Sequence, residues 1–263
     1  MPRNVIDDRF IGSLHLMALT REGLAHDPEL ERTVIQTSTI NALLEGSYEG
    51  DVTIGELLEH GTDGIGTIQG LDGELIVLRG VAYTARADGS VAMVSPETKT
   101  PFAVLTRFQP GAHHRCAGLE YDKFLAEVDA QHPQTPVLGI RASGTFTNLH
   151  LRSVAKQDPP YRPLSDVVAD QTEWHLKEEV GDLIGFRFPD SVAGVEVPGW
   201  HLHFLSSSRD HGGHVVTIDV TEAELEFCEC NELHLELPPA VGLGTVGEAD
   251  KEAINTVEGR QTN

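Results

Sequence analysis

The sequence WHLHFL at residues 200–205 and the sequence HVVTIDV at residues 214–220 flank the segment SSSRDHGG at residues 206–213. Both outer runs are rich in aromatic, aliphatic and β-branched residues, which is typical of strands. The segment between them is rich in Ser, Asp and Gly, which is typical of a turn. The sequence therefore predicts a β-hairpin in the C-terminal half of the chain.

The histidines of this hairpin predict a metal site. His201 and His203 are two residues apart, so on a strand both imidazoles project from the same face. If the turn is centred near Ser208 and Arg209, His214 lies opposite His203, at a Cβ separation of roughly 4.5–5.5 Å. Three imidazoles with an open fourth position are the ligand set of a catalytic zinc. The alternative is a hairpin with incidental histidines, in a chain that carries 13 of them.

Other histidines are weaker candidates for metal ligands. The neighbours His113 and His114 would point to opposite sides of a strand. His211, inside the predicted turn, is an alternative ligand to His214, although a turn residue is usually solvated.

Composition excludes several classes of function. The chain has 263 residues, with 19 Lys and Arg against 41 Asp and Glu, and a formal net charge of −22. This balance argues against binding to nucleic acid or to an anionic membrane surface, since both need clustered basic residues. The sequence has no run of 18 apolar residues and no apolar leader at its N-terminus, so we expect a cytoplasmic protein.

The three cysteines also indicate a reducing compartment. An odd number of cysteines without a framework spacing does not suggest a secreted protein held by disulfides. Cys228 and Cys230 alternate with Phe227, Glu229 and Asn231, as expected for one face of a strand. We therefore expect core positions for both, rather than metal ligands.

The order of elements predicts a mixed α/β (α+β) fold. Residues 1–30 have weak periodicity and are expected to be irregular. A capped helix at 53–61, a meander of strands over 64–94, and a similar order of elements over 164–220 predict two related mixed β-sheet layers with short helices, the metal site lying in the C-terminal half. The expected divisions are a domain over 1–135, a second over 136–240 with the metal site, and a tail over 241–263.

A metal of this kind needs polar partners. Thr67 and Glu74 lie in a glycine-rich hairpin that lacks the G-x-G-x-x-G phosphate spacing. Its glycines fit either turn geometry or a close approach of backbone to a ligand. Arg152 alternates with apolar neighbours, so its guanidinium either grips a carboxylate inside a pocket or is exposed on a strand. No local pattern points to Glu258, in the tail.

Several motifs, taken in order, resemble those of the α-acetolactate decarboxylases. Each piece is generic by itself, whereas the ordered set is specific. The resemblance runs from about Tyr48 to Ile218. Its motifs are EGDVTIGELL at 49–58, HG at 60–61, GIGT at 64–67, LDGE at 71–74, QDPPYRPL at 157–164, and His201, His203 and His214.

The resemblance implies the decarboxylation of 2-acetolactate to acetoin and carbon dioxide, through a metal-stabilised enediolate, in acetoin and butanediol biosynthesis. It implies a zinc ion and a homodimer. It assigns His201, His203 and His214 as the metal ligands, Thr67 as a substrate contact, and Arg152, Glu74 and Glu258 as active-site residues. Because an arginine is a reluctant acid, a glutamate or a bound water is the more natural proton donor.

Two other classes of function compete with this interpretation. The first is a non-catalytic protein that binds a metal or a small ligand through the same hairpin. The second is a cupin-like metal oxygenase, which would need a carboxylate ligand close to the H-x-H motif. Glu196 precedes that motif outside the usual spacing, which disfavours the oxygenase.

Overall fold

Strands make up most of the computed structural model, which describes residues 5–20, 32–111, 113–239, 253–254 and 257. They form a nine-stranded sheet, a five-stranded sheet and a two-stranded ribbon, accompanied by a few short helices. The predicted mixed α/β (α+β) class is confirmed.

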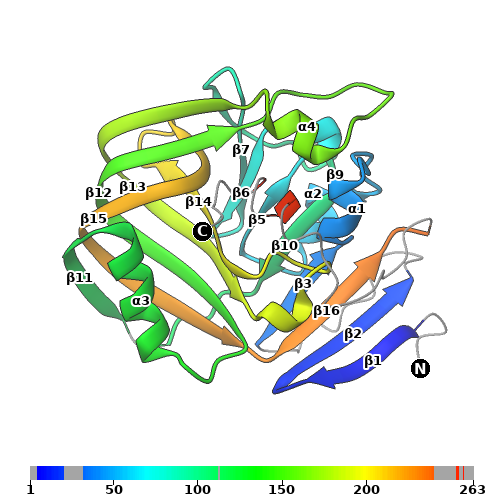
Figure 1. Ribbon diagram of the computed structural model, residues 1–263, viewed down its shortest axis with the longest axis horizontal. Coiled ribbons are helices and arrows are strands. Elements are labelled where there is room, and N and C mark those ends of the chain that lie inside the picture. The colour runs from blue at the N-terminus through cyan, green and yellow to red at the C-terminus, as the bar shows by residue number, and fades with distance from the viewer. Residues whose placement is uncertain (1–4, 21–31, 112, 240–252, 255–256, 258–263) are drawn as a thin grey trace.

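The nine-stranded sheet has the order β1-β2-β16-β3-β10-β5-β6-β7-β8 (Figure 1). Its neighbours are antiparallel, except that β16 runs parallel to both β2 and β3. The predicted meander over 64–94 is confirmed by β5 to β8, which pair in sequence. The bounds are β1 Val5–Ile11, β2 Leu14–Thr20, β3 Thr33–Thr37, β5 Asp63–Thr67, β6 Glu74–Leu78, β7 Val81–Ala85, β8 Val91–Met93, β10 Phe102–Thr106 and β16 Glu232–Leu237.

The prediction of an irregular first 30 residues is wrong for residues 5–20. Strands β1 and β2 form an antiparallel hairpin at one edge of the sheet. On β2, Leu14, Leu16 and Ala18 are buried in the core, whereas most of β1 is exposed. An exposed edge strand needs no apolar face, which is why the periodicity of the sequence is weak there.

The five-stranded sheet has the order β11-β15-β12-β13-β14, and β14 also pairs with β15. Strands β12, β13, β14 and β15 therefore form a closed ring of hydrogen-bonded neighbours. Figure 1 shows them curving beside the larger sheet. The bounds are β11 His114–Leu119, β12 Val137–Ser153, β13 Thr172–Phe188, β14 Gly199–Ser206 and β15 Gly212–Cys230.

The helices are short, and α2 shows why its sequence forms one. The side chain of Thr53 accepts from the backbone N–H of Glu56, whose carboxylate accepts from the backbone N–H of Thr53. This capping box satisfies two backbone donors at the helix N-terminus. The remaining elements are α1 Ile40–Leu44, α2 Ile54–Leu58, α3 Tyr121–Gln131, α4 Leu164–Val168, the 3₁₀ turns Gln69–Leu71 and Asp190–Val192, and the ribbon strands β4 Val52–Thr53 and β9 Lys99–Thr100.

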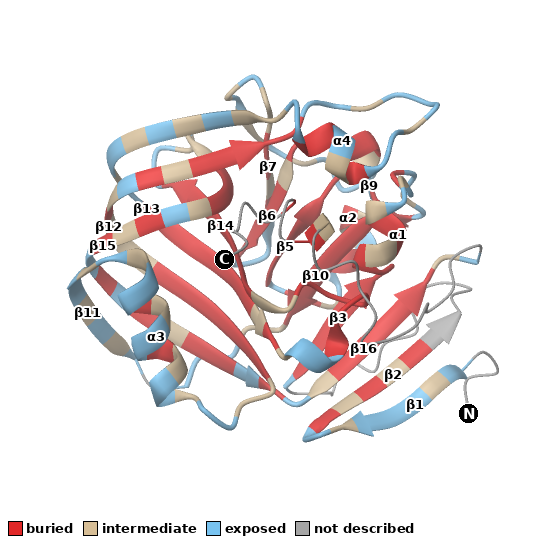
Figure 2. Ribbon diagram, in the orientation of Figure 1, coloured by how far each residue is buried: buried red, intermediate tan, exposed pale blue. Residues whose placement is uncertain are grey.

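The largest hydrophobic cluster joins the two sheets. It combines side chains of the larger sheet, such as Ile65 and Phe102, with side chains of the smaller sheet, such as Phe186 and Leu205. A second cluster packs α3 against the other face of the smaller sheet, and a third packs α2 against the larger sheet. Figure 2 shows buried strands in the middle of the molecule, between the sheets.

The chain passes between the sheets near Asn231. Strand β15 ends at Cys230 in the smaller sheet, and β16 begins at Glu232 in the larger one. Strand β11 likewise joins the smaller sheet, although it precedes residue 136. The division into domains at 135 and 240 stays a prediction.

Cys228 and Cys230 are buried in the core, as predicted, with free thiols. Among the residues described, no helix is long and apolar enough to cross a membrane.

A buried ion network also joins the two sheets. Arg141 of β12 pairs with Asp63 of β5 at 2.9 Å and with Glu226 of β15 at 2.7 Å. Its guanidinium also lies over the Phe108 ring, 4.7 Å from the centroid. The hydrogen bond from Arg141 is the main reason that the pKa of Glu226 lies below its ordinary value.

We expect Arg141→Met to lower the free energy of unfolding by about 3–5 kcal/mol, because it leaves two carboxylates without their buried cation. Urea unfolding measures the loss. The loss should shrink as the pH falls through the lowered pKa of Glu226, since stability from a depressed carboxyl pKa is lost as the carboxylate is protonated.

Arg115→Met is the control, because Arg115 pairs with Glu224 on the surface. Its loss of unfolding free energy should stay under about 1 kcal/mol. Equal losses of unfolding free energy in the two variants would show that burial of the Arg141 network does not add to its stabilising effect.

Candidate metal centre

Strand β14 aims two histidines into the space between the sheets. Leu202 and Phe204 pack in the cluster that contains α3, and His201 and His203, which alternate with them, face the other way. All four side chains are buried. The strand therefore separates its packing residues from its polar ones, as the spacing of the two histidines predicts.

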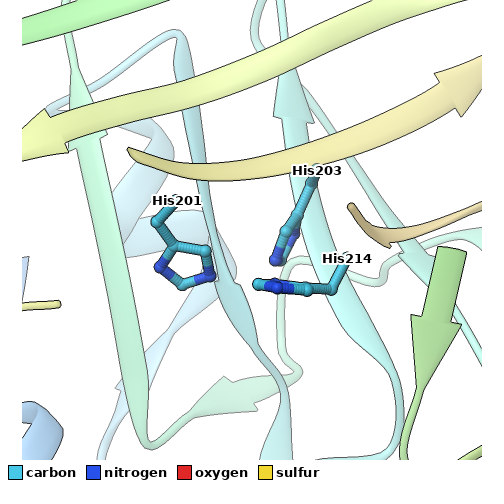
Figure 3. Close-up of side chains that lie close together, drawn as sticks. All are labelled: His201, His203 and His214. Carbon is cyan, nitrogen blue, oxygen red and sulfur yellow. The ribbon is translucent and has the colours of Figure 1, made fainter. Parts of the chain in front are cut away.

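Strand β15 brings the third histidine to the same point. His214 is the cross-strand partner of His203, which confirms the predicted hairpin register. The ring centroids of the three histidines are 5.0–5.5 Å apart, and one ligand nitrogen from each lies within 4.8 Å of the others. Figure 3 shows the three imidazoles pointing toward one another.

Backbone contacts hold His203 in one tautomer. Its Nδ1 lies 2.9 Å from the carbonyl oxygen of Leu75. A carbonyl only accepts, so Nδ1 carries the proton and Nε2 presents its lone pair. Burial, followed by the charge of His201, lowers the pKa of His203 well below its ordinary value. The imidazole is therefore neutral, as a metal ligand must be.

A small pocket adjoins the histidines and has one polar and one apolar side. The polar side contains five of the residues that the sequence analysis singled out, from both sheets. They are Thr67, Glu74, Arg152, His201 and His214. The apolar side is formed by Ile40, Leu43, Leu71, Phe102, Val154, Leu164, Val168 and Val257.

Thr67 and Glu74 face each other across strands β5 and β6. The Thr67 hydroxyl donates to the carbonyl oxygen of Gly73 at 2.9 Å. A carboxylate oxygen of Glu74 lies 3.5 Å from Nε2 of His203, so this glutamate borders the metal site. A Cβ on Gly66 would lie 2.3 Å from the carbonyl oxygen of Phe102. Close packing of backbones therefore accounts for this glycine of the hairpin.

Arg152 lies inside the pocket, not on an exposed strand surface. It is the cross-strand partner of His214, and only 4% of its surface is exposed. Its Nη2 donates to the carbonyl oxygen of Val257. Within the described part of the chain it has no carboxylate partner, and its buried Nε makes no hydrogen bond. A buried guanidinium has the charge and the donors to bind a carboxylate.

Glu258 lies outside the described residues. Its neighbour Val257 lines the pocket and is buried, as is Ile254. The predicted role of Glu258 therefore stays a prediction.

The histidines that were judged weaker are separate from the triad. His211 pairs with Glu179 at 2.8 Å, with 43% of its side chain exposed. His113 is exposed and lies 3.7 Å from Glu226. Neither belongs to the buried group of three.

Sequence reasoning missed the apolar side of the pocket. Ile40 and Leu43 come from α1, and Leu164 and Val168 come from α4. Each pair is spaced by three or four residues, which is the apolar stripe of a helix. That pattern indicates a buried face, but it does not distinguish a pocket wall from ordinary core.

Comparison with known proteins identifies the family of the chain. A family model described as alpha-acetolactate decarboxylase matches residues 34–243, which include the three histidines, Thr67, Glu74 and Arg152. The chain belongs to the alpha-acetolactate decarboxylase family.

Individual relatives agree with the family model. An alpha-acetolactate decarboxylase of Klebsiella aerogenes is 40% identical over 210 residues, covering 79% of this chain and 81% of the relative. One from Methylococcus capsulatus has the same identity and the same coverage. The crystal structure of the Bacillus subtilis strain 168 alpha-acetolactate decarboxylase matches with a TM-score of 0.81 at 31% identity, covering 86% of this chain and 99% of that chain. The sequence relatives and the solved structure thus identify the same family over most of the chain.

Proposed function

We propose that this chain decarboxylates 2-acetolactate to acetoin and carbon dioxide, with zinc held by His201, His203 and His214. Membership of the decarboxylase family supports the reaction, a carboxy-lyase step. The observation that carries the proposal is that three converging imidazoles and the buried guanidinium of Arg152 border the same small pocket.

The histidines fit a metal ion of this kind. His203 is fully buried and neutral, and its Nε2 makes no hydrogen bond within the described residues. The three imidazoles would hold the ion and leave a fourth position toward the pocket, as in catalytic zinc sites. When bound, zinc supplies a Lewis acid that stabilises the negative charge developing on the substrate oxygens as carbon dioxide leaves.

Arg152 binds and orients the carboxylate of the substrate in this proposal. A guanidinium can donate two parallel hydrogen bonds to a carboxylate, which fixes the bond that will break. Because the guanidinium is buried, its attraction for the anion is weakly screened by solvent. As carbon dioxide forms, the negative charge leaves this end of the substrate and moves toward the histidines.

Glu74 is the group that we propose delivers a proton to the carbon from which carbon dioxide departs. Its carboxylate lies beside His203, at the polar side of the pocket. An arginine in a protein does not give up its proton, so Arg152 is not the donor. Thr67, whose hydroxyl hydrogen is committed to Gly73, presents its oxygen as an acceptor for the substrate hydroxyl.

The apolar side of the pocket suits the rest of the substrate. 2-Acetolactate carries two methyl groups beside its polar atoms, and α1 and α4 supply aliphatic side chains to receive them. The same side chains exclude water, which strengthens the electrostatic contacts of Arg152.

The reaction is tested by adding racemic 2-acetolactate to the purified chain and measuring acetoin and carbon dioxide. We expect equal amounts of the two products, formed at a rate well above that of the buffer control. Binding of the substrate without any acetoin above that control would contradict the proposal.

Arg152→Met should lower kcat/KM about 100-fold, because the variant lacks the partner of the substrate carboxylate. Arg152→Lys should recover only part of the loss, since an ammonium does not match a carboxylate with two parallel donors. Steady-state kinetics of both variants, with their metal content measured, check this. Full activity of Arg152→Met would contradict the assigned role.

We also infer a cytoplasmic homodimer that acts in acetoin and butanediol formation. The odd number of cysteines, without the spacing of a disulfide framework, supports a reducing compartment. The dimer follows from the family resemblance alone. Light scattering on the purified chain tests it.

A further inference from the structure

A second group of potential metal ligands lies on the smaller sheet, outside the histidine triad. It consists of His150 on β12 and of Glu173 and His175 on β13. We propose that these three side chains bind a second divalent transition-metal ion, such as zinc. One ligand atom from each residue lies within 4.8 Å of the others.

The pairing of two strands builds this group. His150 and His175 are direct cross-strand partners, and their rings stack with centroids 4.2 Å apart. Glu173 is two residues before His175, so it projects from the same face of β13. The register of two long paired strands therefore holds the three ligands together, and no flexible loop is needed.

The chemistry of the group suits a transition metal. Two imidazoles and one carboxylate form a known zinc ligand set, with the remaining positions open to water. Tetrahedral zinc, with ligands at about 2.0–2.2 Å, needs ligand atoms roughly 3.3 Å from one another, so these side chains would close in around the ion. The net charge of −22 also favours the approach of a cation.

The carboxylate of this group is already oriented. One oxygen of Glu173 lies 2.8 Å from Nε2 of His150, and the other accepts from the side-chain amide of Gln171 at 2.7 Å. The amide of Gln171 is thus an outer contact that would orient a metal ligand.

Ordinary surface pairs in this chain lack the second imidazole. His211 and Glu179 form such a pair at 2.8 Å, on the same sheet. Within the described residues, the groups of three that could hold an ion are the buried triad and this second group. His211 is therefore a matched control, because it has a carboxylate partner but no second imidazole.

The position of the second group gives a bound ion a structural effect. Glu173 is the cross-strand partner of Arg152 in β13, as His214 is in β15. An ion bound by side chains of β12 and β13 would therefore cross-link the two strands next to Arg152. We expect zinc to raise the melting temperature of the full chain through this contact as well as through the triad.

Zinc titration tests the proposal. The full chain is stripped with a chelator and titrated with zinc against a chromophoric competitor. We expect two zinc ions per chain in the unaltered protein, one in His175→Asn, one in Glu173→Gln, and two in His211→Asn. Circular dichroism verifies the fold of each variant.

A single zinc ion per chain in the unaltered protein would overturn the proposal. So would two ions in both His175→Asn and Glu173→Gln. The second variant guards against a folding defect in the first. The count of two rests on the zinc that the proposed function places at the triad, and the second ion is the one lost in His175→Asn and Glu173→Gln. Because the measurement counts ions, its outcome does not depend on whether the chain decarboxylates 2-acetolactate.

Discussion

His203→Ala is expected to remove the metal of the triad and to abolish acetoin formation. His203 is fully buried, and its Nδ1 is held by the carbonyl oxygen of Leu75, so its Nε2 is the nitrogen that faces the other two imidazoles. Two remaining imidazoles bind zinc far more weakly than three. We measure zinc per chain after gel filtration, together with the rate of acetoin formation.

Two controls make this result interpretable. The count is made in a chain that also carries His175→Asn, so that the second group of ligands does not contribute. His211→Asn, in the connection between β14 and β15, should keep both zinc and activity, because His211 lies outside the triad. A His203→Ala protein that still holds one zinc ion would refute the ligand set.

Glu74→Gln is expected to keep its zinc and to lower kcat by roughly 10²–10⁴-fold. This is the usual contribution of a positioned acid or base, and glutamine has nearly the same shape without the proton to give. Glu74 lies 3.5 Å from His203, close enough to act on a substrate held at the triad. Steady-state kinetics and the zinc content measured together check the expectation.

Glu178→Gln is the control, because Glu178 is exposed on the smaller sheet. It should leave kcat unchanged. Loss of zinc in Glu74→Gln would show that Glu74 supports the metal instead of transferring a proton. An unchanged kcat with full zinc content would leave proton delivery to another group.

The local elements of the fold were predictable, and their arrangement was less so. The capping box of Thr53 and Glu56, and the turn between β14 and β15, depend on residues close in sequence. The transfer of the chain to the larger sheet at Asn231 depends on contacts of β16 with β2 and β3, which are far away in sequence. Local periodicity carries no information about such partners.

In the candidate site, too, some residues could be predicted from local sequence and others could not. The H-x-H spacing places His201 and His203 on one face of a strand, and the hairpin register brings His214 to them. The family resemblance was needed to name Thr67, Glu74 and Arg152, since a glycine-rich turn and an exposed strand arginine produce the same local sequence patterns. The apolar wall from α1 and α4 was missed because a pocket wall and a core face have the same helical pattern.

In the proposed reaction, a metal ion held by the histidine triad is required for decarboxylation of 2-acetolactate. The direct measurement is acetoin formation by the full chain before chelation, after chelation, and after zinc is added back. We predict loss of acetoin formation on chelation and its recovery when zinc is restored. Undiminished acetoin formation by protein whose metal content has fallen to zero would show that the reaction needs no metal ion.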